Sequence, residues 1–334
     1  VAGTINEKTL VEGLPLVGTE DFELKIEDGD GNIIEVNLNV NNVSIVEKDN
    51  QTENVALYLV SEEIIRNESE VNCVRIRHNG KISSTVSDII KNNLKSEKNV
   101  EIDATSNNFN FVGNKRKPMY IINWLSKKSI PSKDGKMGET AGYLFFETSE
   151  GYHFRSIDSL FAQKQKKSYG FFGQAETPVG YDGNVESTTN AGIKLPVINK
   201  KFDNTPTRTT FMLRDTGVLP TGDVKEQVKK NEEEIFDVAN ILNQAIRRYS
   251  QFSIGTLEVD IFGDFSLHAG DCVFIDSPSA DQSPDVQADK ITGGKYLIHQ
   301  VKHVIRAGQC QTKLGLVRDS IGRKGKPHNG SMVD

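Results

Sequence analysis

The chain has 334 residues, a net charge of −6 and a charged fraction of 26%, which suits two or three domains with thin cores. It has no apolar run near the ~20 residues that cross a bilayer, and the opening VAGTINEKTL has neither the basic nor the apolar part of a signal peptide. The acidic balance argues against a protein that grips nucleic acid through its whole surface, but not against one past which DNA slides.

Residues 1–105 are predicted to form a first tube-like antiparallel β-barrel domain. Apolar residues alternate along 22–26, 34–40 and 55–59, as in half-buried strands. The DGDGN stretch from Asp28 to Asn32 resembles a calcium loop, but an EF-hand needs Gly at its sixth position and Glu at its twelfth, where Ile33 and Asn39 stand. We therefore expect a hairpin turn there. An apolar stripe from Ile82 to Leu94 predicts a helix packed on this barrel.

Residues 106–205 are predicted to be an inserted α/β domain with an extended arm at about 164–205. A helix is expected from Pro118, followed by a hairpin that turns at 149–151 and a short helix capped by Ser156. The basic cluster at 115–117 could touch phosphate, but charge flanking a helix is the interpretation we favour. The arm is rich in Gly, Asn, Thr and Lys, and its isolated aromatics favour packing on a neighbour over a simple surface loop.

Residues 206–320 are predicted to form a second tube-like barrel domain, and 321–334 a flexible tail. A strand at 211–213 precedes a long helix that starts near Thr221. Four strand patterns follow between 252 and 323, bounded by turns such as Gly263-Asp264 and Gly293-Gly294. The predicted fold class is thus mainly β with an α+β insertion: two tube-like antiparallel β-barrel domains with flanking helices.

The sequence offers no catalytic set. Asp264, His268 and Asp271 lie close together, but a strand-to-strand turn explains them better than acid–base chemistry. His299 and His303 lie about 13 Å apart on an extended strand, too far to share a metal ion. Three cysteines, Cys73, Cys272 and Cys310, do not make a disulfide framework or a recognised zinc pattern, and we expect Cys272 and Cys310 to be reduced core residues on neighbouring strands. No enzyme activity, cofactor or metal is predicted.

Two segments resemble baseplate hub proteins of contractile-tailed bacteriophages. The first segment, within 119–160, contains the motif WL followed by GYLFFETSEGYHFRSIDSL. The second, within 252–320, contains the motifs GDFSLHAGD, GGKYLIHQVKH and LVRDS. The resemblance implies a structural virion protein of the viral tail whose two barrels per chain build a homotrimeric ring with pseudo-sixfold symmetry. Such a ring adapts the hexameric tail tube to the trimeric central spike and lets DNA pass without specific binding during genome ejection.

The partners implied by this resemblance are further copies of the chain, the tail tube protein and the central spike protein, with baseplate wedge or tape-measure proteins as further possibilities. Assembly would take place in the host cytoplasm and the product would be located in the virion tail. Open sheet edges of adjacent copies are expected to pair, so that a lone monomer would be unstable or sticky. The candidate interface residues are Trp124, Phe145, Phe146, Phe171, Phe172, Asp264 and Phe265.

The alternative is a spike-associated hydrolase or a carbohydrate-binding module of a contractile injection machine. A hydrolase needs converging carboxylates or an activated nucleophile, and the sequence shows neither. A carbohydrate binder would place several exposed Trp and Tyr side chains on one face, whereas the single Trp is predicted to lie on a helix.

Overall fold

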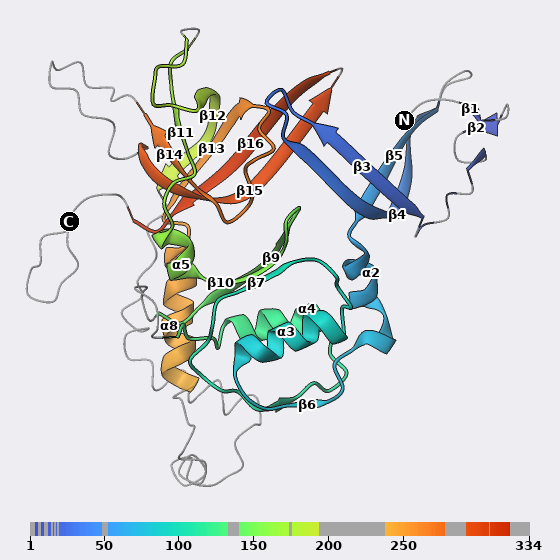
Figure 1. Cartoon of the computed structure of the whole chain (residues 1–334), viewed down its shortest axis with the longest axis vertical. Helices are drawn as coiled ribbons and strands as arrows, with labels where there is room; N and C mark the ends of the chain where they lie inside the picture. The colour runs from blue at the N-terminus through green and yellow to red at the C-terminus, as the bar shows by residue number, and fades with distance from the viewer. Residues whose placement is uncertain are drawn as a thin grey trace, which may run out of the picture.

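The computed structural model describes residues 20–48, 53–132, 140–173, 176–193, 238–277, 292–306 and 308–320, together with 4–5, 8–9 and positions 13, 14, 16 and 18. These residues form an N-terminal open sheet, an α/β unit and a closed barrel (Figure 1). The mainly β class predicted from the sequence is confirmed. The predicted strand at 211–213, the start of the long helix and the predicted tail lie outside the described residues.

The N-terminal sheet is a three-stranded antiparallel meander of β3 (Asp21–Glu27), β4 (Ile33–Lys48) and β5 (Glu53–Val60). A separate pair joins β1 (Thr4–Ile5) and β2 (Lys8–Thr9). The DGDGN stretch is the hairpin turn between β3 and β4, as predicted. Register pairs such as Leu24 with Val36 gather apolar side chains on one face, while Lys25 and Glu35 form an ion pair of 2.7 Å on the other.

This sheet differs from the expected first barrel. Within the described residues its order is β3-β4-β5, without closure. The predicted helix α3 (Ile82–Asn92) buries its stripe against α4 (Pro118–Ser126) and the neighbouring sheet of the α/β unit, so it does not cover the N-terminal strands. The chain leaves β5 at Ser61 and enters the α/β unit directly. That unit therefore begins near residue 61 rather than 106.

The α/β unit holds one core beneath a small mixed sheet. Its sheet has the order β7-β10-β9, with β7 parallel to β10, and a separate pair joins β6 and β8. Apolar side chains of both helices pack on Tyr143, Tyr152 and Phe154 in this core. The further elements of this unit are α2 (Glu62–Glu68), η1 (Glu70–Asn72), β6 (Arg77–His78), β7 (Val100–Ile102), β8 (Phe111–Val112), β9 (Tyr143–Thr148), β10 (Gly151–Ser156) and α5 (Ile157–Ala162).

The barrel closes in the strand order β11-β12-β13-β16-β15-β14. Its interior is filled by twelve buried side chains, including Leu257, Val259 and Ile261 from one strand. It is thus a packed core and not a pore. The strands are β11 (Lys167–Gly170), β12 (Gly183–Ile193), β13 (Gly255–Phe262), β14 (Cys272–Asp276), β15 (Gly294–Arg306) and β16 (Gln309–Arg318).

The expected arm at 164–205 is wrong for its described part, because β11 and β12 are strands of this barrel. β11 also runs parallel to both of its neighbours, β12 and β14, so the barrel is mixed rather than purely antiparallel. The second β unit therefore begins near residue 167 and not at 206.

Helix α8 (Val238–Gln251) joins the barrel to the α/β unit. Gln244 accepts a hydrogen bond from the amide of Ala141 at 3.1 Å, and the buried Arg248 pairs with Asp158 of α5 at 2.7 Å and with Asp319 after β16 at 2.8 Å. Because one arginine bridges both units, α8 ties the barrel to the α/β unit.

The cysteines are free, as expected. Cys272 lies on β14 and Cys310 on β16, and β15 lies between these two strands. The prediction that the two cysteines lie on neighbouring strands is therefore wrong. Burial raises the pKa of the Cys272 thiol, which donates to the carbonyl of Leu160 at 3.3 Å. We expect a thiol reagent to modify Cys73 and Cys310 in the native protein and Cys272 only after unfolding. Equal rates at all three, measured by mass spectrometry, would contradict the placement of β14.

Candidate interaction surfaces

One carboxylate links the N-terminal sheet to the barrel by hydrogen bonds. Asp28, at the β3–β4 turn, accepts hydrogen bonds from the amides of Asp30 (3.0 Å) and Asn32 (2.8 Å) and from the Asn32 side chain (2.9 Å). It also accepts from the amide of Phe265 in the barrel at 2.8 Å. Burial alone would raise the pKa of Asp28, but these hydrogen bonds outweigh it and hold the pKa below its usual value.

The candidate residues Asp264 and Phe265 belong to this same junction. Asp264 is buried, pairs with Lys167 at 2.6 Å and accepts from the Tyr169 hydroxyl at 2.8 Å. Burial would raise its pKa, and the donors around it lower the pKa below the usual value. Phe265 is 3% exposed and contacts His303 edge-to-face at 4.7 Å. Both side chains are thus occupied within the chain.

Phe145 and Phe146 lie on β9 and are half-buried. Phe145 stacks on Tyr152 at 5.5 Å, and Phe146 stacks on His153 at 4.9 Å. Phe146 also reaches the barrel turn at Gly270, where a Cβ would lie 2.7 Å from its ring. Phe146 thus packs directly on this turn, and any larger residue at position 270 would require a shift.

Phe171 and Phe172 follow β11 and are also half-buried. Phe171 packs against the barrel core, and Phe172 meets Tyr181 edge-to-face at 4.9 Å. Their packing is local, and their role as anchors on a neighbouring molecule stays a prediction.

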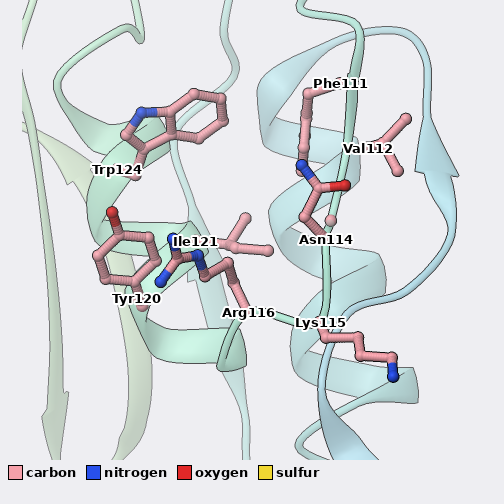
Figure 2. Close-up of a pocket in the computed structure, with 9 residues that line it drawn as sticks. Phe111, Val112, Asn114, Lys115, Arg116, Tyr120, Ile121 and Trp124 are labelled. Carbon is pink, nitrogen blue, oxygen red and sulfur yellow. The ribbon is translucent and has the colours of Figure 1, made fainter. Parts of the chain in front are cut away.

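Trp124 is the candidate that adjoins a hollow. Its ring lies 5.1 Å from that of Phe109 and 5.3 Å from that of Phe111, and the Lys128 ammonium lies 4.0 Å from its centre. Beside this cluster a hollow of about 500 Å³ opens between α4 and the segment 111–116 (Figure 2). Sequence reasoning missed the hollow because it treated the basic cluster there as charge flanking a helix.

Lys128 gives this cluster a pH-dependent stability. Burial, with a smaller contribution from Lys127, lowers the pKa of Lys128 to about 8. Between pH 8 and 10.5 the unfolded chain binds the proton and the folded chain does not, so this group makes stability rise with pH. Lys128→Met should therefore stabilise the protein by roughly 1–3 kcal/mol at pH 7 and by much less at pH 10. Urea unfolding at both pH values measures this, and an equal difference at both would contradict it.

The predicted turn around Asp264 and Asp271 is confirmed. Asp264 accepts from the amide of Ser266 at 3.0 Å, and Asp271 accepts from the amide of His268 at 2.9 Å. His268 Nε2 lies 2.9 Å from the hydroxyl of Ser149, a pair that resembles a nucleophile and its base in outline. Its Nδ1, however, lies 3.7 Å from Asp271 and has no hydrogen-bond partner among the described residues. The arrangement thus lacks the hydrogen bond from Nδ1 to a carboxylate that defines a catalytic triad.

One of the two histidines of β15, His299, lies at a bulge of the strand. The register shifts between Ile298 and Gln300, which leaves His299 over Gly315, while His303 bonds Thr312 at 2.9 Å. Burial lowers the pKa of both histidines. Over the part of the chain that the structure describes, no cluster of three His, Cys, Asp or Glu side chains could hold a metal ion. Within the same residues, no helix is both long enough and apolar enough to span a membrane.

One surface was not anticipated from the sequence. The apolar face of the N-terminal sheet remains partly exposed in the single chain, with the cross-strand pairs Phe22–Leu38, Leu24–Val36 and Ile26–Ile34 along it. The alternation that predicted these strands also predicted this face, but as the inside of a closed barrel. Its openness is the new observation.

The fold defined by these elements is a mainly β structural framework: a packed barrel, an α/β unit and an open sheet. No protein-family model matches the chain, and no curated protein sequence does. Similar solved structures include an Escherichia coli type VI secretion component described as similar to tail proteins of bacteriophage T4 (10% identity, 93% of this chain and 67% of the other, TM-score 0.44).

Two phage tail proteins are also similar. One is the 43 kDa tail protein of prophage MuSo2 from Shewanella oneidensis (10% identity, 90% of this chain and 89% of the other, TM-score 0.49). The other is a tail protein from Neisseria meningitidis MC58 (10% identity, 90% and 87%, TM-score 0.49). These neighbours are tail and secretion-machine proteins. At TM-scores below 0.5, the likeness does not by itself assign a role to this chain.

Proposed function

We propose that the chain is a structural subunit of a phage-type baseplate, and that three copies form a hub ring between a tail tube and a central spike. The motifs within 119–160 and 252–320 motivate this role. The observation that carries it is the open apolar face of the N-terminal sheet. In a ring, this face and the free edges of β3 and β5 are covered by the neighbouring copy.

The energetics favour such covering. Apolar side chains such as Phe22, Leu24 and Val36 are half-buried in the single chain, and removing each from water gains roughly 25 cal/mol per Å². A sheet edge that ends in solvent also presents unpaired N–H and C=O groups to other strands. Within the described residues, neither β3 nor β5 has a partner on its outer side.

The arrangement of the two β units agrees with a ring. The N-terminal sheet and the barrel lie side by side on the same side of the α/β unit (Figure 1). The bond from Phe265 to Asp28 fixes the turn of the sheet against the barrel. Three copies then present six β units at one level. Three of these units are closed barrels, and the other three are N-terminal sheets, each completed by a neighbouring copy.

The role requires no bond-making chemistry. The barrel interior is filled by side chains, so any channel for DNA lies between copies rather than through a barrel. A channel lined by carboxylates would not retain a polyanion, and the net charge of −6 suits this.

Light scattering coupled to size-exclusion chromatography tests the proposal. We expect a mass of three times the 37.0 kDa chain for the purified protein, or that mass plus the mass of the bound spike once the spike protein is added. A well-behaved monomer under both conditions, without self-association at high concentration, would overturn the proposal.

A further inference from the structure

A second surface lies on the α/β unit, apart from the face of the N-terminal sheet proposed to form the ring contacts. The hollow beside Trp124 is bounded by α4 on one side and by β8 and the loop after it on the other (Figure 2). Its apolar wall comes from residues of both segments, and two of them are largely exposed: Val112 at 52% and Tyr120 at 55%. With about 500 Å³, it has room for one large apolar side chain and part of its backbone.

Cationic groups border this apolar wall. The Arg116 guanidinium lies 5.5 Å from the centre of the Tyr120 ring and points into the space between Tyr120 and Ile121 (Figure 2), whereas the Lys115 ammonium points away from it. None of the described carboxylates pairs with Arg116 or Lys115, although the next residue, Lys117, is paired with Glu68. The helix that starts at Pro118 adds the positive end of its dipole nearby.

The backbone holds Arg116 in place. Asn114 and Lys115 both have left-handed conformations, with φ of 49° and 55°, which are uncommon outside glycine. A Cβ at Gly113 would lie 2.4 Å from the carbonyl of Val74, and the amide of Val74 donates to the Arg116 carbonyl at 2.9 Å. Such a conformation persists only where its surroundings determine it, so the loop is preorganised.

We infer that this hollow binds an acidic peptide segment of a partner protein. A large apolar side chain of the segment enters the space between Tyr120 and Trp124, and a neighbouring carboxylate pairs with Arg116 in the forked geometry that guanidinium favours. Nucleic acid fits less well, because one inward-pointing cation does not follow a phosphate backbone and the adjacent cation, Lys117, is already paired with Glu68.

The single tryptophan makes the test direct, since Trp124 lines the hollow. The probe is an unlabelled pentapeptide, acetyl-DEFDE-amide, titrated into the full chain while tryptophan emission is recorded. We expect a saturable change. Replacing the Phe by Ala, or the four acids by their amides, should weaken binding at least tenfold, because each change removes one half of the recognition.

The protein variants separate this site from general charge. Arg116→Glu should weaken binding at least tenfold, while Arg116→Lys should retain part of it. The matched control, Lys302→Glu, reverses the charge of one exposed cation outside the α/β unit and should bind the peptide as the unaltered chain does. Circular dichroism verifies that each variant is folded.

Three outcomes would overturn the inference: no saturable change with the acidic peptide, equal binding by the Arg116→Glu variant, or equal binding by the amide peptide. Tighter binding of an oligothymidylate that competes with the peptide would instead assign the hollow to nucleic acid. The hollow lies outside the N-terminal sheet, so a chain that fails to trimerise can still bind the peptide. The peptide titration therefore tests the hollow, and light scattering separately tests the ring.

Discussion

Replacing Asp28 by Ala should detach the N-terminal sheet from the barrel. The change leaves the amide of Phe265, which is 3% exposed, without its acceptor, and it removes three further hydrogen bonds within the turn. An unsatisfied buried donor costs about 1–3 kcal/mol, so the total loss of stability should be about 2–4 kcal/mol. Hydrogen exchange measures it, as a large rise in the exchange rate of the Phe265 amide.

The matched control is Asp30→Ala in the same turn. Asp30 donates to Asp28 through its main-chain amide, which the substitution keeps. This variant should behave as the unaltered protein does. Similar protection of Phe265 in the Asp28→Ala variant would show that the sheet is held to the barrel in another way.

Acid should mimic the first substitution. Because the pKa of Asp28 is lowered in the folded state, its contribution is present above the unfolded pKa and is lost as the pH falls through the folded value. The Asp28→Ala variant should therefore lose less stability than the unaltered protein when the pH is lowered below about 4.

Leu24→Glu should abolish self-association and leave the single chain folded. Leu24 lies half-buried on the open apolar face, opposite Val36, so the monomer can keep a glutamate there in water. In a ring the same carboxylate would be buried without a partner, which costs several kcal/mol. We expect the dissociation constant to rise by at least about 100-fold, which corresponds to about 2.7 kcal/mol, as measured by sedimentation velocity.

Asn42→Glu adds the same charge at an exposed position of β4 and serves as its control. It should leave association unchanged. Equal loss in both variants would indicate long-range repulsion instead of contact at the apolar face, and no loss in either would show that this face lies outside the interface.

The sequence predicted best those strands that have one face in the core, because their alternation of apolar and polar residues does not depend on which strands lie beside them. Leu257, Val259 and Ile261 alternate because β13 has one face in the barrel core, and the structure places all three there. The helical stripe at 82–94 was found for the same reason. The prediction that this helix packs on the N-terminal strands was wrong, because periodicity reports which face of a helix is buried and not which element covers it.

The strands that close the barrel could not be predicted in this way. After Val185, which is buried, the remaining side chains of β12 are exposed and mostly small or polar, so they carry no period-two signal. The same limit explains the first barrel. Alternation along β3 and β4 is identical for an open sheet and for a closed one, and the difference lies in contacts that local sequence does not encode.

The candidate interface residues divide along similar lines. Aromatic composition found Trp124, which borders the hollow, but it also selected Phe265, which is buried in the chain's own junction. The basic cluster at 115–117 was noticed and assigned to helix flanking. The backbone conformation of Asn114 and Lys115, which holds Arg116 toward the hollow, is not visible in the residue types alone.

The most direct test of the account is a cryo-electron microscopy image of the purified assembly viewed down its axis. We predict a threefold ring with six β units around a central opening, in which the apolar face carrying Leu24 and Val36 is covered by the neighbouring copy. A ring in which this face points to solvent, or particles that remain single chains at all concentrations, would contradict it.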